Sequence, residues 1–536
     1  MPDDLDRCLS EAREALVEPD PGASERVLSA IRASTVGRAA EGFPQPARRP
    51  RSRFTRRRGL LALAGTVVVA GAAAAAVSSF GGGPAAPVAC TVLRERGTDD
   101  QLRYAFYGPD VALDSSGRAL VAWLAASRSV QASSRSSSGD WTKPVNVSGT
   151  LDRRGRPNGV DVVMADDGSG LVAWSGYTTQ VVSWSGSRWS APSLLAQPGH
   201  RSDFTSVPRI AVNVRGQALA LFDAPRIVTY GSGGYGGIGD PFPVLARRDA
   251  DGWHVVAALT GPARVKPVFG RPGQWKRLSR PRLALDAAGR LVIVGGTEGV
   301  EATTGSLDGR FAPLQKLDSS TNPGEMGLAG DDAGGAVAAW TRGTNLVAAN
   351  LDAGGRWTTR IVATPGFYGD IDFHLSVNAH GDAVIAYRAK ARGVHGPRFP
   401  ARNPTERADR LIQAVTYSAT TGTWSRPTTL SSPGRPVNDP RTGIDSEGDA
   451  LVVWVDGPNN GQEPSRLVSS EGTPGGAWKA AADVTPAVSD PIAPALAVAA
   501  DGTAVAAWTG CRGDAAAVQV ADRVGGSWGE PREISR

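Results

Sequence analysis

One motif recurs eight times along the chain, and no other feature restricts the possible folds as strongly. In its first copy a short apolar run leads to Gly117, and an aromatic residue, Trp123, stands six positions later. The glycine recurs at a spacing of 45–73 residues, at Gly117, Gly168, Gly216, Gly289, Gly334, Gly381, Gly448 and Gly502. The aromatic position holds Trp123, Trp174, Phe222, Gly295, Trp340, Tyr387, Trp454 and Trp508.

A second aromatic residue closes each unit, so that 12 of the 14 Trp residues occupy repeat positions. These second aromatics are Trp141, Trp189, Trp253, Phe311, Trp357, Trp424, Trp478 and Trp528. Each unit divides into four short apolar runs separated by turns, the pattern of a four-stranded propeller blade. The sequence predicts an all-β, eight-bladed β-propeller over residues 105–536. Seven blades is the alternative, because Phe222 and Gly295 make the third and fourth units irregular.

The two aromatic columns are interpreted as packing between neighbouring blades. Stacking on a carbohydrate is the functional alternative for the same residues. Each repeat glycine follows a short strand and falls where a tight turn is expected.

The uncharged stretch 59–80 is long enough to cross a membrane, because 22 helical residues span roughly 33 Å. It follows a basic segment, since residues 1–58 hold twelve Arg against nine acids and seven of those Arg lie between Arg48 and Arg58. The excess of Arg predicts a cytoplasmic N-terminus and an extracellular propeller. We therefore expect a short helical cytoplasmic tail (1–38), a basic disordered linker (39–58), a transmembrane helix (59–80) and an extracytoplasmic linker (81–104).

Two alternatives compete with a membrane anchor. The stretch could form a buried Ala-rich helix, or it could be removed after export. Thr55-Arg56-Arg57-Arg58-Gly59-Leu60-Leu61 resembles a twin-arginine export signal, which would release the domain.

The chain has three cysteines, and the predicted topology separates them. Cys8 falls in the reducing compartment, whereas Cys90 and Cys511 fall outside, where a disulfide persists. Cys90 precedes the first blade and Cys511 lies in the last. A disulfide between them would tie the first blade to the last, and two free thiols are the alternative.

Two features of the repeats converge on one rim of the propeller, where the first strand of each blade begins. The first is a set of long insertions between the second and third strands of three units, because such loops often carry function. The insertion of the third unit (224–242) holds the candidate binding residues Tyr235 and Asp240, and that of the sixth unit (390–409) holds His395 and Glu406. The seventh unit has a shorter insertion (456–466).

The second feature is the residue seven places before each repeat glycine, which we call the ring position. In order, it holds Asp110, Asp161, Arg209, Arg282, Gly327, His374, Arg441 and Ala495, so six of eight are ionisable. The next residue in each unit is nearly always apolar. One interpretation is that strand ends are polar because they touch water. The other is a charged funnel, acidic in the first two units, in which Arg209, Arg282 and Arg441 bind an anionic group.

The repeats resemble those of uncharacterised surface and secreted β-propeller proteins of actinobacteria, over roughly residues 105–536. The N-terminal stub is similar to the stubs of actinobacterial single-span proteins, some of them anti-sigma factors, without their zinc-binding motif. A more distant resemblance to sialidases, which are six-bladed propellers, rests on Pro208-Arg209-Ile210 and on glycine turns followed by Trp. The Asp-box itself is missing, and no Tyr–Glu nucleophile pair can be assigned.

Other chemistries have no support in the sequence. The five His show no metal-ligand spacing, and no nucleotide-binding, nucleophile-elbow or EF-hand motif is found. The basic residues form no stripe typical of nucleic-acid binding. We expect no cofactor, no metal and no assignable catalytic residue. The predicted function is a surface module that binds an anionic small molecule, a glycan or a protein, with residues 1–58 available to a cytoplasmic regulator. A sialidase-like glycoside hydrolase is the alternative.

Overall fold

A computed structural model gives the structure of the chain. It describes residues 108–125, 129–149, 159–175, 179–196, 207–228, 237–258, 281–296, 299–320, 323–366, 371–391, 410–458, 465–473, 477–486, 491–512 and 515–536. All regular structure in this part of the chain is β-strand, arranged as eight antiparallel sheets. The prediction of an all-β, eight-bladed propeller with four-stranded blades is confirmed, and the seven-bladed alternative is wrong.

Each blade is formed by consecutive strands in simple up-and-down order. The first four blades are β1 (Asp110–Leu113), β2 (Ala119–Leu124), β3 (Val130–Arg135) and β4 (Val145–Asn146); β5 (Val160–Met164), β6 (Gly170–Ser175), β7 (Thr179–Trp184) and β8 (Ser193–Ala196); β9 (Arg209–Val212), β10 (Ala218–Val228), β11 (Gly237–Asp249) and β12 (Gly252–Ala258); and β13 (Arg282–Leu285), β14 (Arg290–Gly295), β15 (Val300–Ser306) and β16 (Gln315–Asp318).

The last four blades follow the same order, and two of them carry an extra short outer strand. They are β17 (Met326–Gly330), β18 (Ala336–Arg342), β19 (Asn345–Leu351) and β20 (Trp357–Ala363); β21 (Phe373–Val377), β22 (Ala383–Lys390), β23 (Arg410–Ser418), β24 (Thr423–Trp424) and β25 (Thr428–Thr429); β26 (Val437–Ile444), β27 (Ala450–Asp456), β28 (Arg466–Gly472) and β29 (Ala482–Asp483); and β30 (Ile492–Val498), β31 (Ala504–Arg512), β32 (Ala515–Val524), β33 (Ser527–Trp528) and β34 (Arg532–Glu533).

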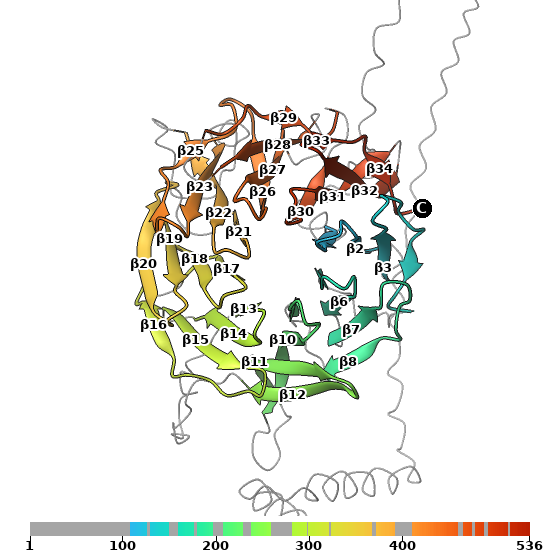
Figure 1. Cartoon of the computed structure of the whole chain (residues 1–536), viewed down its shortest axis with the longest axis vertical. Helices are drawn as coiled ribbons and strands as arrows, with labels where there is room; N and C mark the ends of the chain where they lie inside the picture. The colour runs from blue at the N-terminus through green and yellow to red at the C-terminus, as the bar shows by residue number, and fades with distance from the viewer. Residues whose placement is uncertain are drawn as a thin grey trace, which may run out of the picture. The chain divides into compact units, whose positions relative to one another are not determined.

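The blades form a ring because each one packs against the next. Eight apolar clusters fill the eight interfaces, including the interface between the eighth blade and the first. Figure 1 looks down the ring, with the first strands of the blades, such as β17, β21 and β26, around the axis and β12, β16 and β20 at the circumference. The core is therefore divided among the interfaces, and every blade depends on both of its neighbours.

The aromatic columns lie in these interfaces. Trp174, Trp340, Trp454 and Trp508 are among the largest fully buried side chains, and each belongs to the cluster shared with the preceding blade. The second aromatics pack against the same clusters from the outer strands and are partly buried. Packing between blades, the interpretation favoured by the sequence, is confirmed.

The repeat glycines are needed for backbone geometry. All eight have φ between 71° and 89°, the left-handed region that favours glycine. Each lies in the turn between the first and second strands of its blade. In the first blade, Asp114 closes this turn by accepting hydrogen bonds from the backbone N–H groups of Ser116 (2.9 Å) and Arg118 (2.8 Å).

The ring closes without a sheet shared between the two ends of the propeller. The described strands of the first blade (β1–β4) all come from the N-terminal part of the propeller sequence. Those of the eighth blade (β30–β34) all come from its C-terminal part. Side-chain packing joins them, together with a buried ion pair between Arg135 Nε and Asp522 Oδ1 at 3.0 Å. Cys511 lies near the end of β31, but Cys90 lies outside the described residues, so the disulfide stays a prediction.

Several sequence predictions fall outside the described residues. They include the tail (1–38), the basic linker (39–58), the apolar stretch (59–80) and the linker (81–104). Within the described ranges, no helix has the length and apolar character to cross a membrane.

The insertion of the third blade differs from the expected loop. Its two arms, up to Val228 and from Gly237, pair with each other as extensions of β10 and β11. The extension has a physical reason, since paired strands satisfy the backbone hydrogen bonds that a long open loop leaves to water.

Candidate functional site

The ring position occupies the same structural place in all eight blades. In every blade this residue pairs with the residue just before the first aromatic position, as Asp110 does with Ala122 and His374 with Ala386. The register is the same in the other six blades. All eight residues therefore lie at the same level of the inner strands, which we call the A-start rim. In six blades this is the first or second residue of the strand, whereas β26 and β30 begin earlier.

The two acidic ring residues connect neighbouring blades. Asp110 Oδ2 accepts a hydrogen bond of 2.8 Å from the backbone N–H of Val162, and Asp161 Oδ2 accepts one of 2.8 Å from Ile210. In both cases the donor is the residue directly after the ring position of the next blade. Neither sequence interpretation included this contact. The repetition of an acid at the ring position of adjacent units was the available signal.

The surroundings of Asp110 make its carboxyl hard to ionise. Burial, followed by the charge of Asp161, raises the pKa of Asp110 from 3.8 to about 7, a value that already includes the opposing effects of two backbone hydrogen bonds and Arg209. Asp161 also forms an ion pair with Arg209, at 3.1 Å between Oδ1 and Nη1. The three ring residues of the first three blades thus form one connected group.

His374 makes the same kind of contact from the sixth blade to the seventh. Its Nδ1 accepts a hydrogen bond from the backbone N–H of Thr442 (3.2 Å) and lies 2.9 Å from Thr442 Oγ1. Ser376 holds Thr442 in place, because its hydroxyl donates to the Thr442 carbonyl oxygen at 2.8 Å. Burial first, and then the charges of Arg441 and Arg209, together lower the pKa of His374 from 6.5 to about 3. His374 is therefore neutral at physiological pH.

The basic ring residues divide into two groups. The charges of Arg209 and Arg441 both lower the pKa of His374, although these residues come from the third and seventh blades. Arg282 instead donates from Nε to the carbonyl oxygen of Met326 in the fifth blade, at 2.9 Å. The structure thus links Arg209 and Arg441 to His374 through its pKa and Arg282 to the fifth blade through a hydrogen bond, and joint binding by the three arginines stays a prediction.

Further polar residues of the A-start rim support Arg441. Asp372 Oδ2 accepts a hydrogen bond from the backbone N–H of Asp439 at 3.1 Å. Asp439 has φ 51° and lies in a β-bulge of β26, between Asn438 and Arg441. The Arg441 guanidinium donates from Nη1 to the Pro440 carbonyl oxygen at 2.8 Å. Sequence reasoning missed this support, because a bulge shifts the register and is not visible in the repeat spacing.

The candidate loop residues are not placed by the structure. Tyr235, His395 and Glu406 lie outside the described residues, and for Asp240 only the backbone, within β11, is described. Their contribution to the rim stays a prediction.

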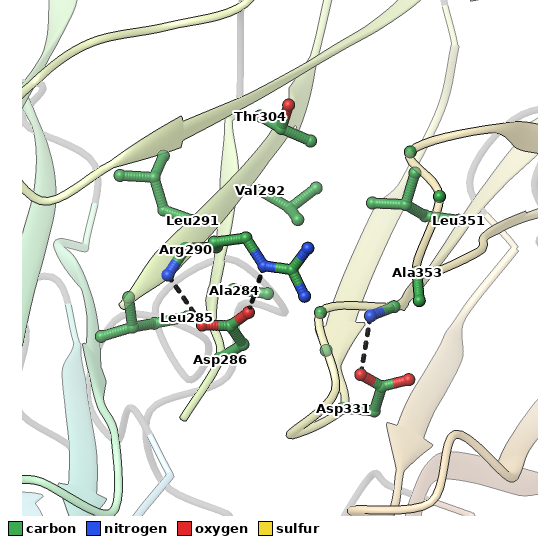
Figure 2. Close-up of a pocket in the computed structure, with 15 residues that line it drawn as sticks. Ala284, Leu285, Asp286, Arg290, Leu291, Val292, Thr304, Asp331, Leu351 and Ala353 are labelled. Atoms are coloured by element: carbon green, nitrogen blue, oxygen red, sulfur yellow. Dashed lines mark hydrogen bonds and ion pairs between the residues drawn. The ribbon is translucent and has the colours of Figure 1, made fainter. Parts of the chain in front are cut away.

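At the opposite end of the inner strands, a pocket of about 160 Å³ opens between the fourth and fifth blades (Figure 2). Gly330 lines it at a repeat position where the other seven blades have an aliphatic residue, namely Leu113, Met164, Val212, Leu285, Val377, Ile444 and Val498. In Figure 2, Arg290 extends across the pocket and pairs with Asp286, at 2.8 Å between Nε and Oδ2. A Cβ at Gly330 would lie 3.1 Å from Ala284 Cβ, so the glycine allows the two blades to approach closely beside the pocket.

One exposed cluster has donor atoms of the kind that hold a metal ion. Ligand atoms of Asp249, Asp251 and His254 lie within 4.8 Å of one another on the outer hairpin of the third blade. His254 Nε2 and Asp251 Oδ1 are already paired at 3.1 Å. The cluster lies on the outermost hairpin, far along its blade from the ring position, and is separate from the A-start rim.

No protein-family model matches the chain, and no curated protein matches its sequence. Its fold is similar to that of a PL25 polysaccharide lyase, an ulvan lyase, at 10% identity over 80% of this chain and 96% of that one (TM-score 0.41). A puromycin hydrolase matches at 16% identity, over 77% of this chain and 60% of the hydrolase (TM-score 0.40). The Hadza microbial sialidase Hz136 matches at 12% identity, over 53% of this chain and 63% of the sialidase (TM-score 0.33). The chain thus spans less than two thirds of the length of that sialidase. At these identities and TM-scores the likenesses say nothing about the function of this chain.

Proposed function

We propose that the propeller is an extracytoplasmic binding module that holds an anionic group at the A-start rim. The observation that carries the proposal is the equivalent position of Arg209, His374 and Arg441 on the inner strands of three blades, and the effect of both arginines on the pKa of His374 supports it. Guanidinium groups bind carboxylate, sulfate and phosphate through paired hydrogen bonds. The rigid inner strands fix the backbone of each of these residues, so little conformational entropy is lost on binding.

Arginine variants test the proposed site. Titration calorimetry of the full chain is carried out with sulfate, phosphate and glucuronate, and with glucose as the neutral comparison. Binding is expected for an anion and not for glucose. The double variant Arg209→Ala/Arg441→Ala should weaken that binding by about 100-fold, because two charge-assisted hydrogen bonds are lost. Arg282 is the control, because it stands at the same ring position but donates to the Met326 carbonyl oxygen. Arg282→Ala should change the affinity for the anion less than threefold. Unchanged affinity in the double variant would remove the proposal.

A second candidate function, glycoside hydrolysis, is favoured by one observation. The Asp110 carboxyl stays protonated up to about pH 7 beside a second carboxyl, Asp161. Glycosidases use such a pair, one group as acid and the other as base or nucleophile. Turnover of fluorogenic glycosides by the full chain, lost in Asp110→Asn, would establish hydrolysis in place of binding alone.

Attachment to the membrane is part of the proposal and rests on the sequence. Residues 59–80 would cross the membrane once, with residues 1–58 in the cytoplasm and free to bind a regulator. The rival is twin-arginine export followed by cleavage. The mass of the mature chain decides between them, since cleavage after the apolar stretch removes about eighty residues.

A further inference from the structure

We infer that His374 acts as a neutral hydrogen-bond donor, through its Nε2–H, to an oxyanion held between Arg209 and Arg441. This inference rests on the proposed function and assigns the chemical class of the ligand group. Carboxylate, sulfate and phosphate share that chemistry. The role of His374 differs from that of a charged anchor, because the imidazole binds without carrying a charge of its own.

The hydrogen bonds of His374 determine which nitrogen carries the proton. A backbone N–H can only donate, so the contact from Thr442 requires that Nδ1 be unprotonated. The Thr442 hydroxyl, 2.9 Å from the same nitrogen, is compatible with this state because a hydroxyl can donate as well as accept. Since the imidazole is neutral, its single proton lies on Nε2. The tautomer is thus set by the seventh blade, against which the imidazole packs.

The donors around this site are available. Among the residues that the structure describes, none forms a hydrogen bond with His374 Nε2, and the side chain is only partly buried. Arg441 uses Nη1 for the Pro440 carbonyl, so its Nε and Nη2 groups remain open. Arg209 uses Nη1 for Asp161, and its side chain is 41% exposed. Each of the three residues thus keeps a group that can only donate, which suits a ligand that can only accept.

The charges around His374 favour an anion. On the strands packed against β21, the charged residues are Arg441 and Asp439 on β26, Arg388 and Lys390 on β22 and Arg342 on β18, while β17 holds none. Asp372 precedes β21 and is bonded to the Asp439 backbone. The charges that act on the imidazole are the positive ones of Arg441 and Arg209. A bound anion offsets them, so binding should raise the pKa of His374.

Nitrogen NMR of histidine-labelled full chain tests the inference, with His374→Asn to assign the signal among five His. In the free protein, the expected spectrum shows a protonated Nε2 and an unprotonated Nδ1. Addition of sulfate, phosphate or acetate, each compared with chloride at equal ionic strength, should raise the imidazole pKa by at least one pH unit. The most effective of the three identifies the oxyanion.

Affinity provides a second readout. Asn at position 374 can still accept the Thr442 N–H, but it lacks the Nε2–H, so His374→Asn should weaken anion binding about tenfold or more. The matched control is His380→Asn, on an exposed turn at the opposite end of β21, with a change under twofold. Binding that depends on the two arginines but leaves the His374 signal unmoved would overturn this inference and keep the proposed function. If binding does not depend on the two arginines and the His374 signal does not move, both this inference and the proposed function are overturned.

Discussion

Replacing Trp454 with alanine is expected to lower the free energy of unfolding by about 3–5 kcal/mol, the usual cost of removing a fully buried large aromatic side chain. Trp454 is 1% exposed and lies in the cluster that joins the sixth and seventh blades. Its indole N–H has no partner in the part of the chain that the structure describes, so the loss is one of packing. Urea denaturation followed by intrinsic fluorescence measures the change.

Trp478 provides the matched control, because it belongs to the same cluster but lies on its outer side and is partly buried. Trp478→Ala should cost about 1–2 kcal/mol, in proportion to the smaller apolar area that it buries. Equal losses of unfolding free energy in Trp454→Ala and Trp478→Ala would contradict the distinct packing roles of the first and second aromatic positions of the repeat. They would instead favour a general loosening of the ring.

Asp110 and His374 are expected to give the propeller two opposite pH dependences. The pKa of Asp110 is raised from 3.8 to about 7, so its contribution to stability is complete below pH 3.8 and is lost as the pH rises through 7. The pKa of His374 is lowered from 6.5 to about 3, so its contribution is complete above pH 6.5 and is lost as the pH falls toward 3. In the native chain the two slopes oppose each other between about pH 4 and 6.5.

Single substitutions should expose each slope. Asp110→Asn retains an acceptor for the Val162 N–H and should raise stability at pH 8 by up to about 4 kcal/mol, at about 1.4 kcal/mol per pH unit. This variant should also lose stability more steeply on acidification, because only the His374 dependence remains. His374→Asn should show the reverse, with stability rising as the pH falls from 7 to 4. Denaturation midpoints from pH 4 to 8 measure both, and parallel profiles for all three proteins would refute the assignment.

Much of the candidate site was visible in the repeat spacing. The glycine column aligned eight equivalent strands, so the ring position could be read in every blade, and its residues do lie at one rim. The partners of these residues were not visible. Asp110 and Asp161 contact backbone N–H groups about fifty residues further along the chain, and such a contact exists only once the blades are packed. Spacing alone also did not show that Arg282 donates a hydrogen bond to the Met326 carbonyl oxygen of the next blade.

The sequence by itself determined the propeller fold, and it favoured eight blades with aromatic packing between them. These are properties of local periodicity: a glycine with positive φ and an apolar strand of fixed length act within one unit, and eight copies make the pattern plain. Only the tertiary structure decided how the ring position is used, because neighbouring blades impose burial, backbone donors and opposing charges there. It thereby set the pKa of Asp110, the tautomer of His374 and the influence of Arg209 on a residue three blades away.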